Sequence, residues 1–285
     1  MWQRSVRDDE RCGCGQAFSS CPFWPEVGRV AFGGWDQVDV DLVTRLRAQV
    51  DRGRFLPLLA SPPLHGRLQP ALDEYVAYYR RTYAAISQVS GNPVVIDSSK
   101  HASLAFCLRS SPGMDLRVVH MVRDSRAVAY SWSKVVDRPD AAGSQMATYK
   151  PASAALRWNL QNSALQLLSQ LGTPTLRVRY EDFVRAPAAT LSEIAAFAGL
   201  PAPDLGFLGT DGPGHWWAEL AATHTASGNP MRFTTGRVPI RYDATWQTAM
   251  LAGNRRTVTA LTLPLLMRYG YLPTAPMTAR KRSER

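Results

Sequence analysis

An apolar, β-branched run that ends on an arginine and turns directly into a helical segment constrains this 285-residue chain most tightly. The run is LRVVHMV, residues 116–122. Arg123 follows it, and a helical pattern occupies residues 124–135. This junction predicts Arg123 at the carboxyl end of a strand, beside the free N–H groups and positive dipole end of a helix. Ser131, eight residues after Arg123, adds a hydroxyl donor. The segment suits a phosphate. The competing interpretation is an ion pair with a carboxylate.

The same alternation of strand and helix extends through the middle of the chain. Apolar runs occupy residues 94–96, 116–122 and 175–178, and helical patterns occupy residues 101–110, 124–135 and 151–171. The alternation predicts an α/β fold, a parallel sheet with helices on both faces. Ligands of such sheets bind at the carboxyl ends of the strands, so we expect Asp97, Arg123 and Tyr180 to cluster there.

Two further helices are expected before the first strand, where apolar residues recur at helical spacing. The residues are Leu42, Leu46 and Val50 in one helix, and Leu72, Val76, Tyr79, Tyr83 and Ile86 in the other. We expect these helices to form a lid or acceptor-side part of the protein.

Composition indicates an enzyme-sized domain. The chain is 45% hydrophobic and has neither an 18-residue apolar run nor a signal-peptide core, so we expect no membrane span and a cytoplasmic location. The formal charge of +10 raises nucleic acid as a partner. However, arginines are interleaved with acids, and the one dense basic run is residues 280–282, in a tail expected to be disordered. No specific nucleic acid is therefore expected.

Several motifs together resemble sulfotransferases that use 3′-phosphoadenylyl sulfate (PAPS). Arg123 and Ser131 match that family's 3′-phosphate-binding element by residue type and spacing. The segment NPVVIDSSKHAS is similar to the one that carries catalytic groups, and PTLRVRYEDFVRAP is similar to the strand ending in Tyr-Glu-Asp. The segments SGNPMRFTTGRVPIRYDATW and LTLPLLMRYGY resemble the carboxyl-terminal part of bacterial members. The resemblance extends over most of residues 1–273.

The resemblance implies a P-loop-NTPase-like sulfotransferase fold and transfer of a sulfonate group from PAPS to a hydroxyl or amine. It assigns Tyr180 to the adenine, and Arg232 and Arg237 to a loop that closes over the cofactor. The acceptor class stays open among small molecules, carbohydrates, lipids and peptides. One domain is expected at residues 1–275, with a helical part at 12–90, a cofactor-binding core at 91–200, a carboxyl-terminal loop and helix at 201–275, and a basic tail at 276–285.

The turn from Asp97 to His101 supplies candidates for the chemistry. Family members place a catalytic histidine in the corresponding turn, and imidazoles in general titrate close to neutral pH, so His101 is a candidate base. Asp97 is the alternative base, and an acid outside the chain is a third possibility. Lys100 is expected to stabilise charge that develops on the bridging oxygen. A capping or outward-facing role for His101 and a solvated Lys100 stay open.

One family feature is missing. The Gly/Ser/Thr-rich loop that cradles the 5′-phosphosulfate should precede Cys12, yet no such loop and no GxxxxGK[ST] motif is found. We expect a fragment with a misplaced start, rather than a member that has lost half of its cofactor site. Two alternative functions stay open, a non-catalytic nucleotide-binding remnant or scaffold and a nucleic-acid-binding protein. The absent Walker lysine argues against a P-loop kinase.

The cysteines form a separate pattern. Cys12, Cys14 and Cys21 are closely spaced, as in some zinc sites, but three ligands fall short of the usual four, and Cys107 lies far away in a helical segment. The sequence therefore favours a glycine-rich turn with buried thiols, or a redox-labile pair, over zinc. No metal is expected.

Overall fold

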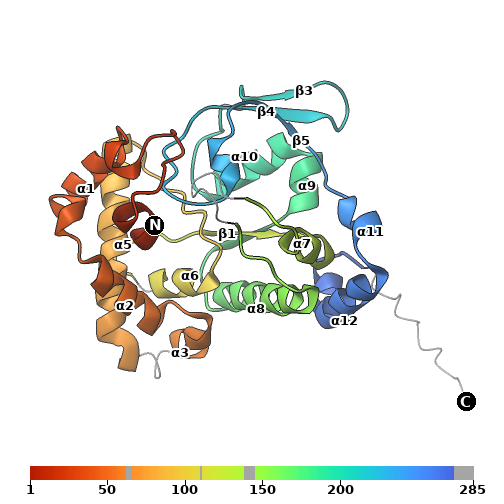
Figure 1. The fold of residues 1–285 in the computed structure, drawn as a ribbon, viewed down its shortest axis with the longest axis horizontal. Coiled ribbons are helices and arrows are strands. Elements are labelled where there is room, and N and C mark those ends of the chain that lie inside the picture. Colours follow the sequence, from red (N-terminus) through yellow and green to blue (C-terminus); the bar gives the residue numbers. More distant parts are fainter. Residues whose placement is uncertain (62–65, 110, 138–144, 273–285) are drawn as a thin grey trace, which may run out of the picture. The chain divides into compact units, whose positions relative to one another are not determined.

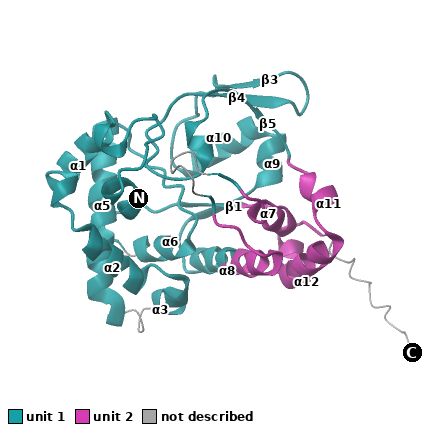
Figure 2. Cartoon of the chain, viewed as in Figure 1, with its two compact units in different colours: residues 1–121, 136–146, 161–242 teal, residues 122–135, 147–160, 243–285 magenta. Residues whose placement is uncertain are grey.

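The computed structural model describes residues 1–61, 66–109, 111–137 and 145–272 (Figure 1). These residues form two compact units (Figure 2). Unit 1 holds residues 1–121, 136–146 and 161–242, and unit 2 holds residues 122–135, 147–160 and those from 243 onward. The expected tail at residues 276–285 lies outside the described residues. The single domain over residues 1–275 stays a prediction.

The amino-terminal part of unit 1 is helical, as predicted. Its helices are α1 Trp24–Phe32, α2 Val40–Val50, α3 Leu56–Ala60 and α5 Gln69–Ser90. Helix α2 begins where the Asp39 carboxylate accepts a hydrogen bond from the Leu42 N–H (2.8 Å). Helix α5 ends at Gly91, whose φ of +69° lies in the left-handed region that favours glycine. The apolar positions that predicted these two helices include the buried residues Leu46, Val50, Leu72 and Val76.

Two of the three strands predicted in the middle segment form, and helices follow them in sequence. Strands β1 (Val118–Val122) and β2 (Thr175–Arg179) form a two-stranded parallel sheet, and the fold class is α/β. The helices that accompany these strands in sequence are α6 Ala102–Leu108, α7 Ser125–Trp132, α8 Pro151–Gln170, α9 Tyr180–Arg185 and α10 Pro187–Phe197.

The strand expected at residues 94–96 does not form. Residues 94–101 have no regular secondary structure, and Ile96 is 87% exposed. A strand needs a neighbour for its N–H and C=O groups. No strand within the described ranges pairs with this run, so the segment leads into α6 as irregular chain.

A second sheet in unit 1 was not predicted. Strands β3 (Leu208–Thr210), β4 (Trp216–Leu220) and β5 (Gly236–Ile240) pair antiparallel in that order. Its strands are short and mostly half-buried, which weakens the alternating pattern on which strand prediction depends. Gly209 is needed here, because a Cβ atom at this position would lie 2.0 Å from the Trp217 indole.

Unit 2 is built from α7, the first half of α8, α11 (Thr245–Ala249) and α12 (Ala252–Arg268). Small side chains allow these helices to pack closely: the buried cluster contains Ala129, Ala154, Ala155, Met250 and Val258. A buried hydrogen bond of 2.7 Å joins the Ser125 and Thr262 hydroxyls and fixes α7 against α12. Across the described parts of both units, no helix combines the length and apolar composition needed to cross a membrane.

A buried carboxylate organises the core of unit 1. Asp51 is 6% exposed and accepts hydrogen bonds from the Tyr75 hydroxyl (2.8 Å) on α5 and the Ser103 hydroxyl on α6. Arg47 Nε lies 3.6 Å from the same carboxylate. A buried carboxylate costs free energy unless donors surround it, so Asp51 holds α2, α5 and α6 in one arrangement.

We expect Tyr75→Phe to lower the free energy of unfolding by about 1.5–3 kcal/mol, because the Asp51 carboxylate loses a buried donor. The shift of the urea midpoint measures this loss. The matched control is Tyr78→Phe on the same helix, which removes a hydroxyl with no carboxylate partner in the described structure, and should cost less than about 0.5 kcal/mol. Equal losses in the two variants would contradict this role of Asp51.

Strand β1 carries a buried histidine. His120 is 2% exposed, and its Nε2 lies 2.8 Å from Asn162 Oδ1. Burial lowers the pKa of His120, although the hydrogen bond to Asn162 acts in the opposite direction. The folded protein therefore takes up a proton at His120 less readily than the unfolded chain does.

This difference in pKa makes stability depend on pH. As the pH falls below about 6.5, His120 takes up a proton more readily in the unfolded chain than in the folded protein. The free energy of unfolding should therefore decrease as the pH falls from about 7.5 to 5.5. Thermal unfolding across this range should show a weaker pH dependence in His120→Gln. The exposed His215→Gln should keep the wild-type dependence. An unchanged pH dependence in His120→Gln would refute the assignment.

Candidate functional site

The backbone at the end of β1 is held by two aromatic side chains of unit 2. The Trp158 indole Nε1 donates to the Arg123 carbonyl (3.0 Å), and the Tyr271 hydroxyl donates to the Val122 carbonyl (3.1 Å). The Trp158 ring packs edge to face against Tyr269, with ring centroids 5.8 Å apart. These contacts fix the point from which the Arg123 side chain starts.

The Arg123 side chain pairs with a carboxylate of the same unit. It is 22% exposed, and its Nη2 lies 3.3 Å from both the Oδ2 and the backbone carbonyl of Asp243. Hydrogen bonds from Thr245 lower the pKa of Asp243, and Arg123 adds to this effect. Asp243 is therefore ionised at neutral pH. This ion pair is the competing interpretation considered for Arg123, and a phosphate at Arg123 must compete with Asp243.

The first turn of α7 is not the free anion-binding site that the sequence predicted. The Asp124 carboxylate accepts a hydrogen bond from the Arg126 N–H (2.8 Å) and so caps the helix itself. The Arg126 side chain forms a bidentate pair with the same carboxylate, at 2.9 Å and 2.6 Å. Asp124 is only 4% exposed. The chain's own carboxylate thus occupies the helix start, and Arg123 and Ser131 are left as the anion-binding candidates of this segment.

Ser131 lies in the last turn of α7 and is partly exposed. Its carbonyl accepts a hydrogen bond from the Lys134 N–H (3.3 Å). Its hydroxyl makes no hydrogen bond to any other residue that the structure describes. Ser131 can therefore donate to a ligand without losing an internal contact.

The turn expected to carry the chemistry lies in unit 1 and is exposed from Asp97 to His101. Asp97 Oδ2 accepts a hydrogen bond from the Tyr83 hydroxyl, and Oδ1 accepts one from the Ser99 N–H (2.7 Å). Burial, followed by the charge of Asp97, raises the pKa of Tyr83, so this phenol remains a donor. The turn is thus fixed to α5 through Asp97, even though its expected strand is absent.

Lys100 and His101 project from the exposed part of this turn. His101 is the residue before α6, but its side chain does not cap the helix. Instead, the Gln161 side-chain oxygen accepts a hydrogen bond from the Ala102 N–H (2.8 Å). The capping role considered for His101 is therefore wrong. Roles for Lys100 and His101 in catalysis stay predictions.

Tyr180 directly follows β2 and begins α9, as the sequence predicted for a residue at a strand end. Its hydroxyl donates to the Arg241 carbonyl (3.1 Å). This bond fixes one end of the phenol, while the ring is only partly buried. A ring held in this way can pack against a flat ligand such as adenine.

The two late arginines have other partners within unit 1. Arg232, in the short 3-10 turn Pro230–Phe233, donates to the carbonyls of Gly228 (3.3 Å) and Arg11 (3.0 Å). Arg237, on β5, pairs with Asp211 at 2.5 Å and stacks on the Trp217 ring at 4.2 Å. Both side chains thus have internal roles, and their contribution to a cofactor stays a prediction.

Sequence reasoning missed two residues that define the surroundings of Arg123. Asp243 is 120 positions away and Trp158 is 35 positions away. Asp243 lies in the segment that resembles the carboxyl-terminal part of bacterial members, but that resemblance does not link it to Arg123, and Trp158 lies in none of the motifs. Only the folded structure shows that Asp243 neutralises the Arg123 guanidinium and that Trp158 positions the Arg123 backbone.

Asp124→Asn should lower the free energy of unfolding by about 1.5–3 kcal/mol, because the partly buried Arg126 guanidinium, which is 15% exposed, loses its charged partner. The matched control is Asp182→Asn, which removes a carboxylate from exposed pairs with Arg179 and Arg185 and should cost less than about 1 kcal/mol. Chemical denaturation measures both values. A loss for Asp124→Asn no larger than the control's would contradict the buried pair.

Comparison with known proteins adds one finding to this geometry. The model of the sulfotransferase family matches residues 37–204, more than half of the 285-residue chain. The matched range contains Asp97, Lys100, His101, Arg123, Ser131 and Tyr180. No curated protein and no solved structure matches the chain closely enough to support a comparison. From the family match, we conclude that the chain belongs to the sulfotransferase family.

Proposed function

We propose that this protein transfers a sulfonate group from PAPS to a hydroxyl or amine of an acceptor. Membership of the sulfotransferase family supports sulfonate transfer in general. The observation that carries the more specific proposal is Arg123: it follows β1 on a fixed backbone, and Ser131 follows eight residues later on α7. That arrangement fits recognition of the 3′-phosphate that distinguishes PAPS from other adenosine nucleotides.

Binding at Arg123 is proposed to proceed by exchange of anions. In the free protein Asp243 supplies a single negative charge at 3.3 Å. A phosphate monoester carries about −1.5 to −2 charges near neutral pH and offers three acceptor oxygens. It is therefore the stronger partner for the guanidinium. The Ser131 hydroxyl adds a donor that needs no such exchange.

The nucleoside end of the donor is assigned to Tyr180. The hydrogen bond from its hydroxyl to the Arg241 carbonyl holds the ring in place before a ligand binds. A preordered aromatic ring loses little conformational freedom on stacking, which favours affinity. Arg232 and Arg237 are assigned to a loop that closes over the cofactor. Each must first release or share its present partners to contact the cofactor.

The transfer step needs a base for the acceptor and positive charge on the leaving group. The acceptor oxygen or nitrogen attacks sulfur, the bond from sulfur to the bridging phosphate oxygen breaks, and the acceptor proton passes to the base. His101 and Asp97 both stay candidates for the base. Asp97 already accepts hydrogen bonds from Tyr83 and Ser99, whereas the His101 ring is exposed. The Lys100 ammonium is proposed to stabilise the charge on the departing adenosine 3′,5′-bisphosphate.

A second candidate function uses the same residues without transfer. The nucleotide contacts assigned to Arg123, Ser131 and Tyr180 also serve a nucleotide-binding protein with no catalysis. It is favoured by the Asp97 carboxylate, which already accepts hydrogen bonds from Tyr83 and Ser99 and is therefore less available as a base. Tight binding of adenosine 3′,5′-bisphosphate without release of sulfonate from PAPS to any acceptor would favour this candidate.

Arg123→Ala should weaken binding of adenosine 3′,5′-bisphosphate by about 1.5–3 kcal/mol, roughly 10- to 150-fold in Kd, because a charge-assisted contact to phosphate is lost. Calorimetric titration measures this change. Arg256→Ala is the matched control, since it removes the same charge from an exposed site on α12 of the same unit. Its affinity should equal that of the wild type.

Two results would refute the phosphate assignment. One is an Arg123→Ala variant that remains folded and binds as tightly as the wild type. The other is an equal loss of affinity in Arg256→Ala, because binding would then reflect general charge rather than a site. Asp243→Asn removes the competing carboxylate and should not weaken binding in a folded variant.

A further inference from the structure

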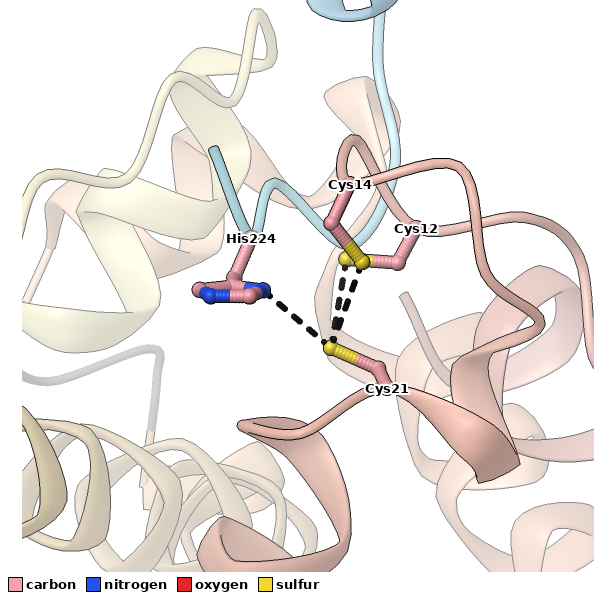
Figure 3. A group of neighbouring side chains, drawn as sticks. All are labelled: Cys12, Cys14, Cys21 and His224. Atoms are coloured by element: carbon pink, nitrogen blue, oxygen red, sulfur yellow. Dashed lines mark hydrogen bonds between the residues drawn. The ribbon is translucent and has the colours of Figure 1, made fainter. Parts of the chain in front are cut away.

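Three cysteines and a distant histidine converge on one point of unit 1 (Figure 3). Cys12, Cys14 and Cys21 come from the amino-terminal segment, and His224 comes from the loop that follows β4, 203 residues after Cys21. The four ligand atoms all lie within 4.8 Å of one another. The sequence pattern had supplied only three of these ligands.

The distances within this cluster match a tetrahedral metal site. Cys21 Sγ lies 3.6 Å from Cys12 Sγ, 3.7 Å from Cys14 Sγ and 3.3 Å from His224 Nδ1. A tetrahedral zinc ion with Zn–S bonds of about 2.3 Å separates its sulfur ligands by roughly 3.8 Å. Its sulfur and nitrogen ligands lie roughly 3.6 Å apart. The side chains therefore surround a space that one zinc ion fills.

The backbone brings the thiols to this position. The Cys12 N–H donates to the Gln16 carbonyl (2.8 Å) and the Gly15 N–H donates to the Cys12 carbonyl (2.9 Å), which closes a tight turn. Gly15 has a φ of +88°, a conformation that side-chain-bearing residues rarely adopt. This turn places Cys12 and Cys14 on the same side. The Phe23 N–H points at Cys21 Sγ (3.5 Å), the kind of contact that supports a metal-bound thiolate.

The histidine is oriented by groups outside the cluster. The Trp24 indole Nε1 donates to the His224 carbonyl (2.8 Å), and the Phe23 ring stacks on the imidazole with centroids 5.4 Å apart. The Gly13 N–H also donates to the Thr225 carbonyl (3.0 Å), next to His224. Nδ1 is thereby directed at the sulfur atoms. Such support by neighbouring groups is a regular feature of metal-binding histidines.

The four side chains differ in exposure in a way that suits a bound ion. Cys12 and Cys21 are buried, Cys14 is partly buried and His224 is exposed, so an ion can enter from the His224 side. A divalent cation would replace the thiol protons and supply the positive charge that buried thiolates need.

We propose that Cys12, Cys14, Cys21 and His224 form a structural zinc site. Three thiolates and one imidazole are ligands that favour zinc, and four protein ligands complete its tetrahedral shell. No position remains for a substrate or water, so the ion has a structural role. It ties the amino-terminal segment to the loop between β4 and β5, where Arg232 also contacts the Arg11 carbonyl. This inference is independent of the proposed sulfonate donor, and it revises the expectation that no metal is held.

The test measures zinc in the purified full chain by mass spectrometry, together with the number of free thiols. We expect one zinc ion per chain and its release when a mercurial reagent modifies the cysteines. Replacement by Co²⁺ should give the ligand-field and thiolate charge-transfer bands of a tetrahedral sulfur site. These measurements on the wild type do not depend on whether any variant folds.

Variants then identify the ligands. Cys14→Ser and His224→Gln should lose zinc to a chelator at least tenfold faster than the wild type. Cys107→Ser and His215→Gln remove the same residue types outside the cluster and should retain zinc as the wild type does. Three results would overturn the proposal: a folded chain that takes up no zinc or cobalt, a disulfide among the three cysteines in the protein purified under reducing conditions, or undiminished zinc retention in both ligand variants.

Discussion

The candidate site depends on one positive charge that is held at the end of a strand. Arg123 is only 22% exposed, so its guanidinium needs an anion beside it, and Asp243 supplies one in the free protein. Trp158 and Tyr271 hold the backbone on either side, which prevents the arginine from moving away to find another partner. In the proposed function, this fixed cation is the group that exchanges Asp243 for the more strongly charged phosphate.

The sequence revealed the elements of this arrangement but not its partners. Local patterns predicted β1, α7 and the position of Tyr180 at the end of a strand, because strand and helix periodicity depends on neighbouring residues. The strand at residues 94–96 was predicted wrongly, since a strand also requires a paired neighbour. The pairing of Asp243 with Arg123 across 120 residues has no local signal. Long-range pairing becomes visible only in the folded chain.

The proposed metal site, too, could be predicted only in part from the sequence. Cys12, Cys14 and Cys21 indicated an incomplete ligand set, and His224 completes it from a loop that no spacing rule connects to them. A site of this kind would give the carboxyl-terminal loop of unit 1 a fixed attachment to the amino-terminal segment. Because Arg232 lies in that loop and already contacts Arg11, the attachment would limit how far the proposed cofactor-closing residues can move.

Hydrogen–deuterium exchange with and without adenosine 3′,5′-bisphosphate tests the central claim most directly. If the residues that follow the two parallel strands bind the nucleotide, exchange should slow in the peptides that contain Arg123 and α7 and in those that contain Tyr180 and α9. The measurement does not require a known acceptor. Protection confined to other parts of the chain, or no protection in a folded protein at saturating nucleotide, would contradict the account.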